Sequence, residues 1–160
     1  MTYRRSGITA LHPATLAATW FGAGLLPKAP GTWGSLAALP FAWALASMGG
    51  TSVLAAATIV CFALGWWASA VYVRRTGVDD PGEVVIDEVA GIWLTLVFSP
   101  PDLLSYGLGF VLFRIFDIWK PWPVSWADRD IGGGLGVMLD DVLAGIYALA
   151  GLTLIRMVLS

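Results

Sequence analysis

The side chains best suited to chemistry are concentrated between residues 113 and 141. This stretch, FRIFDIWKPWPVSWADRDIGGGLGVMLDD, holds eight of the twenty charged residues of a chain that is 58% hydrophobic. Charged groups close to lipid are costly, so they usually have a functional task. The eight residues are Arg114, Asp117, Lys120, Asp128, Arg129, Asp130, Asp140 and Asp141. The stretch is therefore the first candidate for a functional site.

A second group of acids, Glu83, Asp87 and Glu88, lies upstream at the start of an apolar run. Clustered carboxylates repel one another unless a cation sits among them. Oxygen ligands favour Mg²⁺ or Mn²⁺ over zinc, and the chain has only one histidine and one cysteine. If the two groups of acids meet in the fold, they predict a site for a hard divalent cation.

Basic residues and a proline- and glycine-containing loop supply candidate phosphate ligands. The loop, residues 25–35 (LLPKAPGTWGS), precedes an apolar run, and the N-terminus of a helix is a favourable seat for phosphate. Thr32 or Ser35 is the expected N-cap. A divalent cation, basic side chains and a helix N-terminus together indicate phosphoryl chemistry. The candidate phosphate ligands are Lys28, Arg114, Lys120 and the backbone around Thr32, Gly34 and Ser35.

The composition assigns these residues to an integral membrane protein. Only 12% of the residues are charged, and the mean hydropathy is +0.76. A soluble domain of this size needs more polar surface. The 160 residues fit one domain, covering 1–160. The formal net charge of −2 gives no indication of nucleic-acid binding, and the single cysteine excludes a disulfide framework.

The apolar runs predict an all-α, polytopic membrane bundle of about five helices. Several runs are near the lower length limit for spanning. Residues 8–24 predict an additional N-terminal interfacial helix that starts near Pro13; if this segment crosses the membrane instead, the count becomes six. Small residues spaced four apart, such as Ala144 and Ala148, suit close helix packing. The five runs cover residues 34–48, 52–73, 84–98, 103–119 and 142–159.

The segment between the fourth and fifth runs, residues 120–141, is expected to be a long loop. Lys120-Pro121 should end the fourth helix, because proline lacks a donor and restricts the residue before it. The glycines of residues 132–136 predict a flexible backbone that approaches a ligand closely. Asp140 and Asp141 then open the fifth helix, where capping is a competing explanation for them.

The basic residues predict the orientation. If five helices alternate, the basic residues up to Arg129 fall on one side, whereas loops 49–51 and 99–102 carry neither lysine nor arginine. The positive-inside rule places the basic side in the cytoplasm. The same topology gathers the acids at the cytoplasmic ends of three helices; alternatively, the charges only anchor helices at the interface. The gathered acids are Glu83, Asp87, Glu88, Asp117, Asp140 and Asp141.

Four blocks of the sequence resemble the signature motifs of the phosphatidylglycerophosphatase A family. They are PGTWGSLAALP (30–40), VIDEVAGIW (85–93), FRIFDIWKPWPV (113–124) and GGLGVMLDDVLAG (133–145). The resemblance implies a Mg²⁺-dependent, multi-pass enzyme of the bacterial inner membrane whose active site faces the cytoplasm. It would hydrolyse phosphatidylglycerophosphate to phosphatidylglycerol and phosphate in phospholipid biosynthesis.

The resemblance also implies roles for individual residues. The expected metal ligands are Asp87, Glu88, Asp117, Asp140 and Asp141, and the expected catalytic residues are Asp87, Asp117, Asp140, Lys120 and Arg114. Two routes to hydrolysis stay open. Water attacks directly with a carboxylate as base, or Asp117 or Asp140 attacks and forms an acyl-phosphate. Adjacent pairs of acids at helix ends suit ligands, which favours water.

The competing class is a small ion-binding or transport membrane protein with a carboxylate cluster on its cytoplasmic side. A transport path predicts acids in mid-helix, lining a route across the bilayer. Here the acids are expected at one end of the bundle, and residues 34–48 and 52–73 contain no charged residue. The sequence therefore favours the phosphatase.

Overall fold

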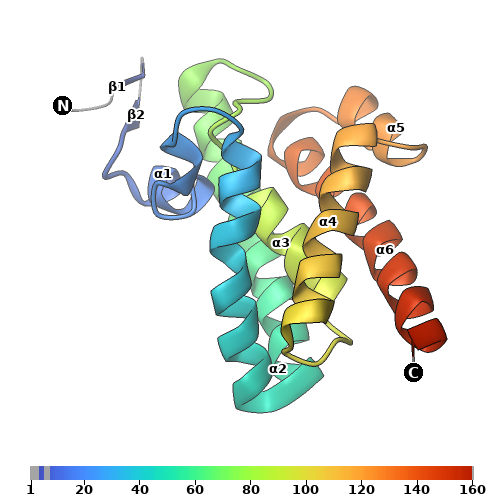
Figure 1. The fold of residues 1–160 in the computed structure, drawn as a ribbon. Helices are drawn as coiled ribbons and strands as arrows, with labels where there is room; N and C mark the ends of the chain where they lie inside the picture. Colours follow the sequence, from blue (N-terminus) through green and yellow to red (C-terminus); the bar gives the residue numbers. More distant parts are fainter. Residues whose placement is uncertain (1–3, 6–7, 160) are drawn as a thin grey trace.

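The computed structural model describes residues 4–5 and 8–159, and the fold is helical apart from a two-residue antiparallel ribbon. The ribbon pairs β1 (Arg4–Arg5) with β2 (Ile8–Thr9). In Figure 1 the long helices lie side by side, and α1 and α5 lie near one end of the bundle. The helices are α1 (Pro13–Ala18), the 3₁₀ helix η1 (Ala23–Leu25), α2 (Pro30–Thr76), α3 (Ile86–Leu96), α4 (Leu103–Trp119), α5 (Val124–Asp130) and α6 (Gly133–Leu159).

Helix α2 consists of two arms that reverse direction at Gly49 and Gly50, as the lower end of Figure 1 shows. Gly50 has a positive φ of 61°, a backbone conformation that glycine adopts without strain. The sequence predicted a break here, with helices over 34–48 and 52–73.

The predicted N-cap of α2 was wrong, because Ala29 caps the helix and Thr32 and Ser35 lie inside it. Pro30 takes the first helical position, where its missing N–H has no partner to lose.

Helices α1 and α4 begin where the sequence predicts. Pro13 starts α1 behind the N-cap His12, although the helix has only six residues and not the length expected of residues 8–24. Asp102 caps α4 by accepting a hydrogen bond from the backbone N–H of Ser105 at 2.7 Å. The helix ends at Trp119, after which Lys120 adopts a left-handed conformation. The predicted boundaries, 103–119, are confirmed.

The predicted loop between residues 120 and 141 is wrong, because most of it is helical. Helix α5 occupies its middle, and α6 begins at Gly133 instead of residue 142. Two of the four glycines are packing positions: a Cβ on Gly134 would collide with the backbone of Ala70, and one on Gly136 with the carbonyl of Ile131. Close packing overrides their low helix propensity. Asp140 and Asp141 therefore lie about two turns inside α6, so the capping interpretation is also wrong.

Two helices in the described part of the chain, α2 and α6, are long and apolar enough to cross a membrane. The expected five apolar spans are not confirmed. Helix α3 has 11 residues, which is about 16 Å of helix against a hydrocarbon core of about 30 Å. Nine of its 11 residues are buried, because α3 packs against α2, α4 and α6. Its apolar sequence reflects burial within the protein.

Candidate active site

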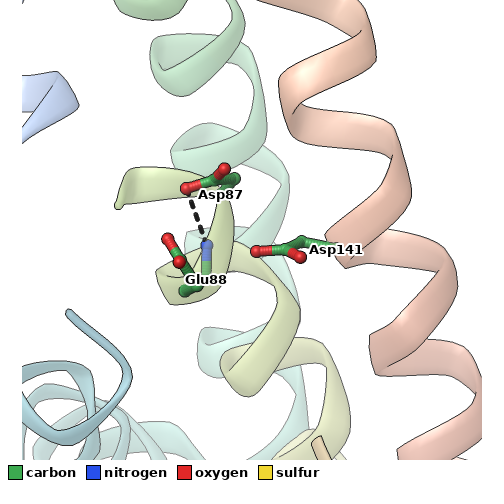
Figure 2. A group of neighbouring side chains, drawn as sticks. All are labelled: Asp87, Glu88 and Asp141. Carbon is green, nitrogen blue, oxygen red and sulfur yellow. Dashed lines mark hydrogen bonds between the residues drawn. The ribbon is translucent and has the colours of Figure 1, made fainter. Parts of the chain in front are cut away.

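Three carboxylates from two helices meet at the end of the bundle where α3 begins. Asp87 and Glu88 lie in the first turn of α3, and Asp141 points toward them from α6 (Figure 2). One ligand atom from each residue lies within 4.8 Å of the other two. Asp87 and Asp141 are only 9% and 3% exposed. These three residues are called the carboxylate triad below.

Gly91 brings α3 into close contact with α6. A Cβ on Gly91 would lie 2.8 Å from the carbonyl oxygen of Asp141 and would also collide with the ring of Phe113. Since Gly91 lies one turn after Asp87, this close approach holds the start of α3 against α6. Within the triad, the backbone N–H of Glu88 donates to Asp87 Oδ1 at 3.0 Å. The triad is thus fixed by backbone packing.

A cavity of about 300 Å³ opens beside the triad. Eight of the chain's eleven acids line it, together with Lys120 and Arg129. The acids come from the loop before α3, from α3, from the end of α4, from α5 and from α6. They are Asp79, Asp80, Asp87, Glu88, Asp117, Asp128, Asp140 and Asp141. So high a density of negative charge calls for cations.

Lys120 is the cation on the wall of the cavity that pairs with two of these acids. Its ammonium group donates to Asp128 and, at 2.8 Å, to Asp140 Oδ2. Partial burial disfavours its charged form, but the two hydrogen bonds outweigh that effect and raise the pKa of Lys120 above its usual value. Lys120 therefore carries its charge at neutral pH.

Arg114 lies on the other side of the acids and does not line the cavity. Its Nη1 is 2.5 Å from Asp117 Oδ2 and 3.9 Å from Glu88 Oε1. The first contact joins residues three apart in the sequence, which lie on the same face of α4. Gly31, at the start of α2, packs so closely here that a Cβ would collide with Glu88. Arg114 thus joins α3 to α4 and holds both acids in place.

The donor set fits a hard divalent cation. Glu88 Oε2 and Asp140 Oδ1 are buried and find no hydrogen-bond partner in the described part of the chain, which is costly for a carboxylate. Oxygen donors at this spacing are the ligands that Mg²⁺ accepts. All five expected metal ligands line one cavity. Three of them form the triad, whereas Asp117 and Asp140 pair with Arg114 and Lys120.

The candidate phosphate ligands from residues 25–35 do not line the cavity. Lys28 is exposed, and Gly34 packs against Val85. The buried hydroxyl of Ser35 donates to the carbonyl of Gly31 at 2.8 Å, and Thr32 lies one turn inside α2. Phosphate binding by Lys28, Thr32, Gly34 and Ser35 stays a prediction.

The structure adds four charged residues to the cavity wall to which the sequence assigned no role: Asp79, Asp80, Asp128 and Arg129. The first two lie in the loop before α3, and the other two lie on α5, a helix that the sequence did not predict. Glu83, which the predicted topology grouped with the other acids, is not among the lining residues. Only the tertiary fold determines which of these loop charges face the cavity.

Comparison with known proteins gives the same family as the sequence blocks. The family model described as phosphatidylglycerophosphatase A matches residues 16–156. Phosphatidylglycerophosphatase A of Escherichia coli is 40% identical over 145 residues, which cover 90% of this chain and 84% of the relative. The protein of the same name from Haemophilus influenzae is 42% identical over 142 residues, covering 88% of this chain and 87% of the relative.

A third relative carries a different name. A Bacteroides thetaiotaomicron protein, provisionally named a phosphatidylinositol-3-phosphatase, is 40% identical over 160 residues, covering 90% of this chain and 94% of the relative. No solved structure matches the chain. The family match spans α2 through α6 and includes every residue of the triad. The chain therefore belongs to the phosphatidylglycerophosphatase A family, a family of phosphoric monoester hydrolases.

Proposed function

We propose that the protein removes the terminal phosphate of phosphatidylglycerophosphate and leaves phosphatidylglycerol, a step of phospholipid biosynthesis. The observation that carries the proposal is the carboxylate triad beside a cavity that also presents Lys120. Phosphoryl transfer depends on positioning and on stabilising charge at the phosphoryl oxygens. A cavity with a cation-binding triad on one wall and a fixed ammonium on another meets both needs.

The metal proposed for this site is Mg²⁺, held by Asp87, Glu88 and Asp141. When bound, it would supply positive charge for the transferring phosphoryl group. Asp117, on the same cavity, completes the ligand set. The support for Mg²⁺ is the all-oxygen donor set and the buried Oε2 of Glu88, which has no partner in the described chain.

Lys120 is the proposed direct ligand of the phosphate. Its ammonium group already lies between two carboxylates on the cavity wall, and its third N–H can donate to a phosphate oxygen while both pairs are kept. Arg114 acts through Asp117 and Glu88, whose carboxylates it holds. The two basic residues therefore have different roles: Lys120 binds substrate, and Arg114 positions acids.

Water is the proposed nucleophile, with Asp140 as the base. Lys120 occupies Asp140 Oδ2, while Oδ1 is buried and unpaired within the described residues, so it can accept a proton. The oxygen of water bonds to phosphorus, the ester P–O bond breaks, and the released alkoxide of the lipid takes up a proton. Attack by Asp117 or Asp140 is the alternative.

The cavity is proposed to face the cytoplasm of a bacterium, from an enzyme embedded in the inner membrane. Arg74 and Arg75 end α2 at the same end of the bundle as the cavity, near Asp79 and Asp80. The positive-inside rule places such an end in the cytoplasm. Exposed apolar side chains on the outer helices, such as Ile59, Ile118 and Val158, provide the lipid-facing surface.

Phosphate release by the purified protein from a panel of lipid phosphates tests the proposal. The panel contains phosphatidylglycerophosphate, phosphatidylinositol 3-phosphate and phosphatidic acid in mixed micelles with Mg²⁺. The name of the Bacteroides relative makes the second lipid the specific competitor. We expect the highest kcat/KM for phosphatidylglycerophosphate. Release from phosphatidylinositol 3-phosphate alone would overturn the substrate while keeping the reaction class.

A further inference from the structure

A second hollow lies outside the cavity, on the outer face of α2. It has a volume of about 280 Å³ and is lined by Ala63, Trp66, Trp67, Ala70 and Arg74. The two alanines leave space beside the indole rings, each of which belongs to a residue that is 48% exposed. Exposed aromatic side chains of this size mark surfaces that other molecules cover. This hollow is called the α2 groove below.

Arg74 gives the α2 groove a charged end. Its side chain is exposed at the last turn of α2, and it forms no ion pair with any residue that the structure describes. An apolar, tryptophan-lined groove with an unpaired guanidinium at one end is complementary to an amphipathic anion. In a membrane such a molecule is a phospholipid, since tryptophan and arginine both favour the headgroup level.

The α2 groove adjoins the cavity through the start of α6. Gly134 packs directly on the backbone of Ala70, which lines the groove, while the neighbouring Gly133 lines the cavity. Arg74 also lies near the end of α2, and the chain continues from there to Asp79 and Asp80 on the cavity wall. One extended ligand can therefore cross the first turn of α6 and occupy both places.

The proposed substrate has the right chemistry for this arrangement. Phosphatidylglycerophosphate carries two phosphates, a phosphodiester next to the acyl chains and a terminal monoester, separated by a glycerol unit. We propose that the α2 groove binds the lipid part of the substrate, with Arg74 on the phosphodiester and an acyl chain against Trp66 and Trp67. This inference rests on the proposed function, and it makes Arg74 a residue that selects lipid phosphates carrying a phosphodiester.

The kinetic test compares Arg74→Gln with Arg75→Gln. Both arginines are exposed at the same turn of α2, and only Arg74 lines the groove, so Arg75→Gln is a matched control for loss of one charge. Loss of a charge-assisted hydrogen bond to phosphate should raise KM for phosphatidylglycerophosphate about tenfold, with kcat unchanged. Arg75→Gln should keep the wild-type KM. An equal rise in both variants would show a general interfacial charge effect and overturn the proposal.

A binding measurement tests the same groove without turnover. Phosphatidylglycerol with brominated acyl chains quenches tryptophan fluorescence on contact, and the Trp66→Phe/Trp67→Phe double variant reports how much of the quenching comes from the groove. We expect this share to fall in Arg74→Gln and to persist in Arg75→Gln. If wild-type protein releases no phosphate, the proposed function fails, but the quenching result still decides the groove. Quenching that is unaffected by Arg74→Gln would contradict the proposal.

Discussion

Gly145 lies against the carbonyl oxygen of Gly91, so that a Cβ on Gly145 would be 2.6 Å from that oxygen. Each glycine lies four residues after an acid of the triad, Asp141 on α6 and Asp87 on α3. The two helices therefore cross at backbone contact one turn away from the carboxylates. This crossing sets how far Asp141 is from Asp87.

The substitution Gly145→Ala should disturb the triad. The added methyl group meets backbone, which cannot turn aside as a flexible side chain would, so α3 and α6 must separate. We expect a loss of stability of about 1–3 kcal/mol and a lower kcat. Thermal unfolding in detergent and phosphate release measure the two effects.

Gly151→Ala is the control for that variant. It lies on the same helix, and its Cβ would meet Leu112 at 3.6 Å, an ordinary contact. Because alanine has the higher helix propensity, the control should be neutral or slightly stabilising. Equal behaviour of the two variants would show that the crossing does not position the acids.

Arg114→Lys should reduce activity although it keeps the charge. The guanidinium of Arg114 reaches both Asp117 and Glu88, and a lysine ammonium is a point charge without the planar fork. We expect kcat to fall about tenfold. Full activity in Arg114→Lys would mean that the position of Glu88 does not depend on this contact.

Lys120 should stay charged throughout the usual assay range. Partial burial disfavours its charged form, but hydrogen bonds to Asp128 and Asp140 outweigh that effect and raise the pKa of Lys120, so its ammonium group stays charged below the pKa of an unfolded lysine, about 10.4. The contribution of that charge is lost only as pH rises through the higher folded value. Between about pH 8 and about pH 9, Lys120→Met should therefore lower kcat/KM by a constant factor. A loss that grows or disappears with pH inside this window would contradict the assignment.

The sequence predicted a helix correctly where local signals, such as caps and prolines, agree with the tertiary packing. Asp102 and the prolines after Lys120 fix both ends of α4 by local rules, so its bounds were predictable. The glycines at the start of α6 indicated a loop, because their packing against Ala70 and Ile131 depends on the tertiary fold. Helix α3 resembled a membrane span because burial by protein and burial by lipid select the same residues.

The site residues also divide into those that local sequence signals identify and those that only the tertiary fold brings to the cavity. The acids of the triad were identifiable because they lie in adjacent pairs at the ends of apolar runs. Asp79 and Asp80 were not, and Asp128 was recognised only as part of the charged stretch 113–141, since the position of these acids on the cavity wall depends on the path of a loop and on α5. Lys120 was identifiable as a candidate site residue, but its pairing with Asp140 required α6 to start early enough to place that residue beside it.

Stereochemistry at phosphorus separates the two nucleophiles. If water attacks directly, hydrolysis of a substrate with a chiral terminal phosphate proceeds with one in-line displacement and net inversion. An acyl-phosphate on Asp117 or Asp140 requires two displacements and gives net retention. We expect inversion, since Lys120 and Arg114 already engage these two carboxylates.

The most direct test of the carboxylate site is phosphate release from phosphatidylglycerophosphate by wild type, Asp117→Asn, Asp141→Asn and Asp130→Asn, with Mg²⁺ and with EDTA. Asp130 is exposed and does not line the cavity, so its variant controls for loss of one acid. We predict activity in wild type and Asp130→Asn that EDTA abolishes and Mg²⁺ restores. In Asp117→Asn and Asp141→Asn, activity should fall at least about 100-fold in protein that remains folded. Near wild-type activity in both, or activity that persists in EDTA, would contradict the account.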